Sequence, residues 1–119
     1  MNVEQLRDYC LSLGEVEEKF PFAKFKAARD VLVFYVSGHM FCYFDINNLQ
    51  HINVKCQPER IALLKEQHDC MGNPYNGNPK FWLSIDATKA SPSIVQELVS
   101  NSYNIVKAKY PPPHHRHEP

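Results

Sequence analysis

Apolar residues recur with helical spacing in three segments of the chain. In the first, Asn2 can cap a helix that Gly14 ends, and the apolar positions between them are Val3, Leu6, Cys10 and Leu13. A second helix begins at Pro58, which suits a first helical turn, and carries Ile61, Leu64 and His68 on one face. The third begins at Ser91-Pro92 and has a broad apolar stripe: Ile94, Val95, Leu98, Val99, Ser102, Tyr103 and Val106.

Between the first two helices, β-rich runs predict an antiparallel sheet. Residues 31–36 and 40–44 flank Ser37-Gly38-His39, which is typical of a hairpin. A further strand is expected at 50–55, and the last strand at 81–86. Residues 24–27 alternate lysine with apolar residues, which indicates an exposed edge strand.

The order of these elements predicts an α+β fold, a two-layer sandwich whose antiparallel sheet has its helices packed on one face. Residues 1–110 are expected to form this single domain, and the Pro- and His-rich tail, 111–119, is expected to be disordered. Residues 69–80 are rich in Gly, Asn and Pro, which favours a long loop or a tight hairpin.

The hairpin strands are apolar at nearly every position, whereas a one-sided sheet should alternate apolar with polar. Some of Phe34, Tyr35, Phe41 and Tyr43 must then face away from the helices. Either the long loop covers them, or this open face meets a partner, because large exposed apolar patches mark interaction sites.

The net charge and the cysteine spacing limit which classes of function the sequence supports. The formal net charge is zero, with 13 basic and 13 acidic residues, so nucleic-acid binding would need a local basic patch. The four cysteines are far apart and form no Cys-x-x-Cys, which favours reduced, mostly buried thiols in a cytoplasmic protein. No apolar run is long enough to span a bilayer, and the N-terminus is unlike a secretory signal.

Several ordered segments carry a family resemblance over nearly the whole chain. They are Tyr9-Cys10-Leu11, Glu17-Glu18-Lys19-Phe20-Pro21-Phe22, Gly38-His39-Met40-Phe41, Asn53-Val54-Lys55-Cys56-Gln57-Pro58-Glu59, Trp82 after a lysine-bearing loop, and Ser102-Tyr103-Asn104-Ile105-Val106. In this order they resemble the MmcQ/YjbR family of small bacterial proteins. The resemblance implies a frataxin-like (CyaY-like) fold and a double-wing DNA-binding motif, with no enzymatic activity attached. Members often show Lys-Lys-His-Trp where this chain has Pro79-Lys80-Phe81-Trp82, which removes a positive charge and an imidazole from that segment.

Candidate nucleic-acid contacts follow from residue type and place. Asn53 and Lys55, next to a helix N-terminus, could hold a phosphate, or Lys55 could be a solubilising charge at a strand end. Trp82 could stack on a base or anchor the core. Lys80 and the cluster Lys24, Lys26 and Arg29 could contact phosphates, and the alternative for each is an ordinary solvated charge. Asn76, at the Asn76-Gly77 turn, is the candidate for loop insertion.

The sequence supports a catalytic or metal-binding site less well than it supports nucleic-acid contacts. Glu15, Glu17 and Glu18 supply few carboxylates for a hard-metal site, because such a site needs several oxygen ligands that converge on the ion. The alternative is that these residues form a solvated acidic turn. No nucleophile with its base is recognisable, so we expect no catalytic residue, no metal site and no cofactor.

The sequence thus leads to three hypotheses. The first is a non-enzymatic DNA-binding protein with weak, salt-dependent affinity. The second is a protein-interaction module or homodimer that uses an aromatic sheet face, and the third is a metal or ligand carrier of frataxin type.

Overall fold

The computed structural model describes residues 1–111, which contain three α-helices, six strands and one 3-10 helix. The helices are α1 (Val3–Ser12), α2 (Pro58–Gln67) and α3 (Pro92–Lys109), and η1 (Lys26–Ala28) is the 3-10 helix. The strands are β1 (Glu17–Lys19), β2 (Val31–Val36), β3 (His39–Asp45), β4 (Asn48–Lys55), β5 (Met71–Gly72) and β6 (Trp82–Ile85). The expected tail, 111–119, lies outside the described residues except for Pro111.

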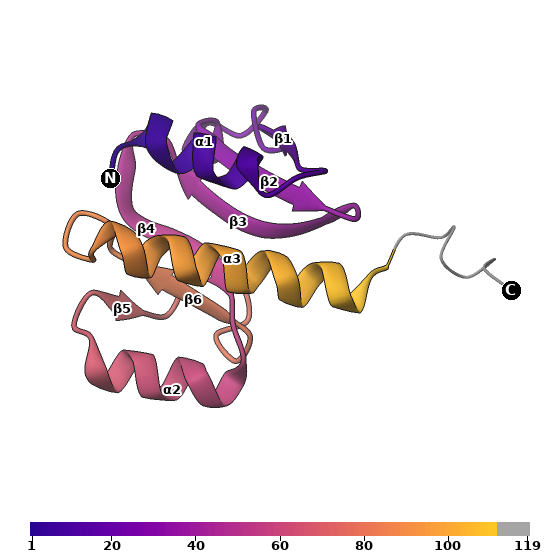
Figure 1. The fold of residues 1–119 in the computed structure, drawn as a ribbon. Helices are drawn as coiled ribbons and strands as arrows, with labels where there is room; N and C mark the ends of the chain where they lie inside the picture. Colours follow the sequence, from indigo (N-terminus) through magenta and orange to yellow (C-terminus); the bar gives the residue numbers. More distant parts are fainter. Residues whose placement is uncertain (112–119) are drawn as a thin grey trace, which may run out of the picture.

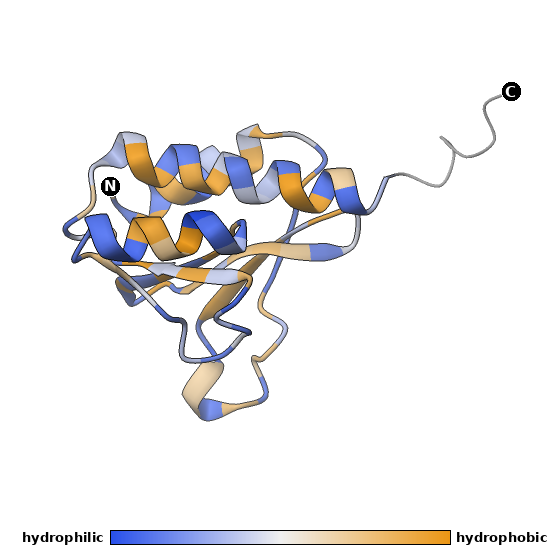
Figure 2. Cartoon of the chain, turned by 90° about the horizontal axis from the view of Figure 1, so that it is seen from below, coloured by the Kyte–Doolittle hydropathy of each residue, from blue (hydrophilic) through white to orange (hydrophobic). Residues whose placement is uncertain are grey.

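All six strands form one antiparallel sheet in the order β1-β2-β3-β4-β6-β5. The three helices cover one face of this sheet, with α3 running across its middle and α1 and α2 on either side (Figure 1). Figure 2 shows the helices as one layer above the sheet, with loops below it. The predicted two-layer α+β sandwich is therefore confirmed. Within the described residues, no helix is both long and apolar enough to cross a membrane.

Local signals begin each helix where the sequence predicts. Asn2 and Gln5 form a capping box at α1, with each side chain bonded to the other's backbone N–H at 2.8 and 2.9 Å. Ser91 caps α3 by accepting from the backbone N–H of Ile94, and Pro58 and Pro92 lie in the first turns of their helices. These caps satisfy backbone donors that a helix start leaves without partners.

A bulge in the β2–β3 hairpin explains why this hairpin is apolar almost throughout. The register shifts between Phe34 and Tyr35, so that Phe34 pairs with Cys42 while Tyr35 pairs with Met40. The extra residue, Phe41, is fully buried and packs edge-on to Tyr103 of α3, with ring centroids 5.4 Å apart. Both Phe41 and Cys42 can therefore face the helices although they are adjacent in the chain.

The predicted edge strand at 24–27 is wrong. Lys26–Ala28 is η1, and the backbone N–H groups of Phe25 and Ala28 bond back to the carbonyls of Phe22 and Phe25, as in consecutive turns. Phe25 is 64% exposed, so its apolar side chain has no sheet to pack on. The edge strand is instead β1, part of the segment predicted as a solvated acidic turn, which pairs with β2.

Candidate functional site

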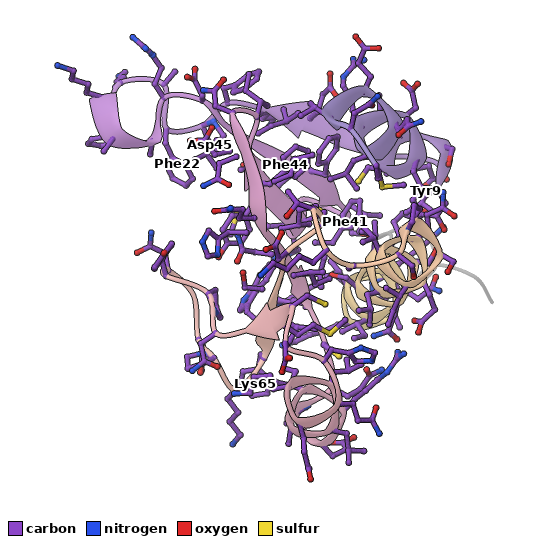
Figure 3. All side chains as sticks on the ribbon, turned by 90° about the vertical axis from the view of Figure 1, so that its left-hand side faces the viewer. Tyr9, Phe22, Phe41, Phe44, Asp45 and Lys65 are labelled. Atoms are coloured by element: carbon purple, nitrogen blue, oxygen red, sulfur yellow. The ribbon has the colours of Figure 1, made fainter. Side chains whose placement is uncertain are left out.

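Two loops project from the face of the sheet that the helices leave open. The first, residues 20–30, contains η1 and follows β1; the second, residues 73–81, connects β5 to β6. Figure 3 shows both loops on the side of the sheet opposite the helices, with Phe22 and Asp45 on the loop side. The sequence predicted that the long loop or a partner would cover aromatic residues of this face, and loop 73–81 does lie against part of it.

Cross-strand pairing defines which side chains the open face presents, because directly paired residues point to the same side of a sheet. Tyr43 pairs with Val33 and with Asn53, Asn53 pairs with Ser84, and Lys55 pairs with Trp82. Of the four hairpin aromatics named from the sequence, Tyr35 and Tyr43 face away from the helices, and Phe34 and Phe41 face them. The open face is thus a mixed surface of aromatic and polar side chains.

A cavity of about 570 Å³ lies on this face, between the two loops. This volume is in the range typical of small-molecule sites, about 300–1,000 Å³. Strand residues supply its floor and loop residues supply its sides, and the lining is mostly apolar: Phe22, Ala28, Val31, Met40, Tyr43, Phe44, Asp45, Asn48, His51, Asn53, Tyr75, Asn76, Gly77 and Trp82.

Asn53 is the most unusual polar residue of the cavity. It is 7% exposed, and its Nδ2 donates to the backbone carbonyls of Tyr43 and His51 at 3.2 and 3.1 Å. These two acceptors fix the amide orientation, because a flipped amide would place Oδ1 against both carbonyl oxygens. Oδ1 is then buried without a hydrogen-bond partner in the described part of the chain, a condition that costs about 1–3 kcal/mol.

Tyr43 and Trp82 form an aromatic pair that holds loop 73–81 against the sheet. Their ring centroids are 5.2 Å apart in an edge-to-face arrangement, and the Tyr43 hydroxyl donates to the carbonyl of Asn76. Burial raises the pKa of the Tyr43 phenol, so the group remains a protonated donor at neutral pH. Nearby, the Tyr75 and His51 rings lie 4.6 Å apart. The loop is thereby anchored at its tip.

Gly77 allows this close approach, and its replacement by alanine should loosen the loop. Its φ is +112°, and a Cβ would lie 3.0 Å from the Tyr43 hydroxyl oxygen and 3.5 Å from the Trp82 ring. We expect Gly77→Ala to lower the free energy of unfolding by about 1–3 kcal/mol. Trp82 fluorescence should shift to the red and become more open to acrylamide quenching.

The matched control is Gly72→Ala in β5. A Cβ at Gly72 meets nothing within 4 Å and its φ is not positive. This variant should leave both stability and Trp82 quenching close to those of the parent chain. Equal quenching in the two variants would show that Gly77 does not hold the loop.

The cations predicted as phosphate contacts lie on or beside the two loops. Lys24, Lys26 and Arg29 belong to loop 20–30, Lys80 belongs to loop 73–81, and Lys55 stands at the end of β4 with its Nζ 5.6 Å from the Trp82 ring centroid. Arg29 is 3.8 Å from the carboxylate of Asp30, while the described residues give Lys24, Lys26, Lys55 and Lys80 no ion-pair partner.

The other candidates from the sequence are Trp82 and the acidic cluster, and neither is a free side chain on the two loops. Trp82 is 8% exposed, so it anchors the open-face packing and also lines the cavity. Glu17 and Glu18 of the acidic cluster are engaged in ion pairs with Lys19 and Arg7. Among residues 1–111, no three His, Cys, Asp or Glu side chains are grouped to hold a metal ion.

The cysteines are free, and three of them are buried. A hydrogen bond with Cys10, together with burial, raises the pKa of Cys42 well above its usual value, and burial raises that of Cys56. Both thiols are therefore poor nucleophiles at neutral pH.

Sequence reasoning did not identify Asp45, Phe22 and Tyr75 as site residues. Asp45 and Tyr43 reach the cavity through the strand register that follows the bulge, which a pattern of apolar residues does not encode. Phe22 and Tyr75 were visible only as aromatic residues in loops. An aromatic residue in a loop that also contains proline and lysine is the signal that could have indicated them.

The fold and the cavity define an α+β protein with a two-loop site on the open face of its sheet. Its sequence matches the YjbR family model over residues 11–105, and the chain belongs to that family. It is 25% identical over 105 residues to the uncharacterized protein YbdF of Escherichia coli O157:H7, covering 87% of this chain and 82% of YbdF. The family predicted from the sequence is therefore confirmed.

Two crystal structures have similar folds. Protein DR2400 of Deinococcus radiodurans superposes with a TM-score of 0.82 at 28% identity, over 98% of this chain and 86% of that one. A protein from Pseudomonas syringae gives a TM-score of 0.75 at 20% identity, over 89% of this chain and 99% of that one, which is a likeness of fold. The resemblance to frataxin remains a prediction from the sequence.

Proposed function

We propose that this chain binds DNA through loops 20–30 and 73–81, and that it prefers single strands to duplex. The observation that carries the proposal is the shared composition of the two loops. They contain four cations, Lys24, Lys26, Arg29 and Lys80, and a single acid, Asp30. A neutral chain therefore has a local basic surface on the open face, which supplies the attraction to phosphate that its net charge does not.

Exposed aromatic side chains lie in the same two loops. Of the large hydrophobic residues exposed in the described structure, Leu63 lies on α2 and all others lie in the loops: Phe20, Phe22, Phe25, Tyr75 and Phe81. Tyr75 is 83% exposed and Phe25 is 64% exposed. Cations interleaved with exposed aromatics are typical of single-strand binding, in which each base stacked on a ring contributes about 1–3 kcal/mol.

The sequence predicts that the tip of loop 73–81 inserts into DNA at Asn76, and the proposal keeps this contact. The backbone of Asn76 and Gly77 lies against Tyr43 and Trp82, and the exposed residues of this loop that can meet a strand include Asn76, Tyr75, Lys80 and Phe81. Lys55, Asn53 and Trp82 lie on the sheet between the loops. In this proposal they line the path of a base that turns toward the sheet.

Fluorescence anisotropy with labelled single-stranded and duplex DNA tests the proposal. We expect tighter binding of the single strand at low salt, with log K falling linearly with log salt by about 0.7 per neutralised phosphate. The triple variant Lys24→Ala/Lys26→Ala/Lys80→Ala should bind more weakly, and its salt slope should be smaller by about 2. Absence of binding at tens of micromolar protein would refute the proposal.

A matched triple variant separates local contact from net charge. Arg60→Ala/Lys107→Ala/Lys109→Ala removes the same number of charges from α2 and α3, in the helix layer on the other face of the sheet, where Arg60 bonds to Glu97. It should keep most of the affinity and nearly the whole salt slope. Equal losses in the two triple variants would mean that the loops are not the binding surface.

A homodimer that uses the same loops is the second candidate, and the exposed phenylalanines of loop 20–30 favour it. Light scattering without DNA separates the two functions. A dimer that DNA does not dissociate would favour self-association. A monomer at high concentration would exclude it.

A further inference from the structure

The cavity beneath the loops has free hydrogen-bond acceptors of its own. Oδ1 of Asn53 is buried and receives no hydrogen bond from residues 1–111, although the residue lines the cavity. Asp45 also lines it, and the backbone N–H of Asn47, at 2.8 Å from Oδ1, is the donor that the described structure gives to this carboxylate. A buried acceptor without a donor, beside a carboxylate with a single donor, calls for a ligand that brings N–H groups to this cavity.

Aromatic rings surround these acceptors from two directions. Tyr43 and Trp82 rise from the sheet, while Phe22 and Tyr75 come from the two loops. Rings on opposing sides of a cavity favour a flat ligand, which can stack on one ring and meet the edge of another. Burial of the Tyr43 hydroxyl against the Asn76 carbonyl leaves that hydroxyl's proton unavailable to a ligand.

We propose that this cavity binds a flat heteroaromatic group carrying N–H donors, the chemistry of an amino-bearing purine or pyrimidine base. Stacking on the exposed rings of Phe22 and Tyr75 places the base beside Trp82, its amino group donates to Oδ1 of Asn53, and a further N–H group reaches Asp45. The base can be that of a free nucleoside or one unstacked from a strand. In the second case the inference rests on the proposed DNA binding, and in the first case it does not.

Trp82 is the single tryptophan of the chain and lines the cavity, so its fluorescence reports on the site directly. Adenosine is expected to quench it saturably. Purine riboside, which has the same ring system without the exocyclic amino group, should bind about tenfold more weakly, the effect of one hydrogen bond to a buried acceptor. Absence of saturable quenching by adenosine and by cytidine, or equal affinity for adenosine and purine riboside, would overturn the inference.

A substitution that fills the cavity tests where the ligand binds without touching the core. Ala28→Phe on η1 places a ring in the cavity and should reduce adenosine affinity at least tenfold. Ala27→Phe is the matched control, because Ala27 is the adjacent exposed residue and does not line the cavity. Equal affinities in these two variants would place the nucleoside elsewhere and refute the site.

Asn53→Leu removes the acceptor and should abolish the preference for adenosine over purine riboside. If this variant does not fold, because Asn53 also bonds two backbone carbonyls, the comparison of the alanine-to-phenylalanine pair decides the question. Oligonucleotides distinguish the source of the base. Loss of strand binding in the Lys24→Ala/Lys26→Ala/Lys80→Ala variant with adenosine binding retained would leave the cavity inference standing. Strand binding by the parent chain without saturable binding of adenosine or cytidine would remove the inference and leave the proposed function.

Discussion

Replacing Phe34 by alanine is expected to lower the free energy of unfolding by about 3–5 kcal/mol, a large part of the stability of a domain of this size. Phe34 is fully buried on the helix face of β2. Its ring centroid lies 5.9 Å from that of Phe44 and 6.5 Å from that of Phe41. Alanine would therefore remove a central ring of the aromatic cluster and leave a cavity that the rigid sheet cannot close.

Denaturant unfolding followed by circular dichroism measures this loss. Phe25→Ala is the control, because Phe25 is 64% exposed in loop 20–30 and its removal should change stability by less than about 0.5 kcal/mol. Similar losses in both variants would show that Phe25 is packed and that loop 20–30 is not exposed as described.

The helices and the hairpin could be predicted from the sequence because each combines a long periodic pattern with its own end signals. α3 repeats its apolar stripe over 18 residues and begins at a serine cap followed by proline. The failure at 24–27 has the opposite cause. Four residues that alternate lysine and apolar side chains are equally compatible with an exposed turn, and only a neighbouring strand could decide between them. That neighbour, β2, pairs with β1 instead.

The candidate site was predictable in its residue types and not in its shape. Asn53, Asn76 and Trp82 were selected from the sequence, and all three line the cavity. The chain order does not reveal that Asn53 Oδ1 lacks a donor, because this depends on where the carbonyls of Tyr43 and His51 point. Such a feature arises from strand register, and register is set by tertiary packing.

Ser102 of α3 is part of an apolar stripe in the sequence, and in the structure its buried hydroxyl links α3 to two strands of the sheet. The sequence places it within the apolar stripe of α3, where it is fully buried. Its hydroxyl accepts from the backbone N–H of Lys55 at 2.8 Å and donates to the carbonyl of Phe41. One side chain of α3 thus satisfies the bulge residue of β3 and the end of β4, where the strand turns into α2.

Ser102→Ala is therefore expected to cost about 2–4 kcal/mol of unfolding free energy, because two buried backbone groups would each lose their partner. The loss should be local as well as global. Hydrogen exchange of the Lys55 amide should become faster, while the amides in the middle of α1 should change only in proportion to overall stability.

Ser93→Ala on the same helix is the matched control, since Ser93 is exposed and its hydroxyl lies 3.3 Å from that of Ser91. It should leave both the unfolding free energy and Lys55 exchange nearly unchanged. If Ser102→Ala behaved in the same way, water would have to replace the lost hydroxyl at both backbone groups. The end of β4, and with it Lys55 beside Trp82, would then be held by packing alone rather than by a buried hydrogen bond to α3.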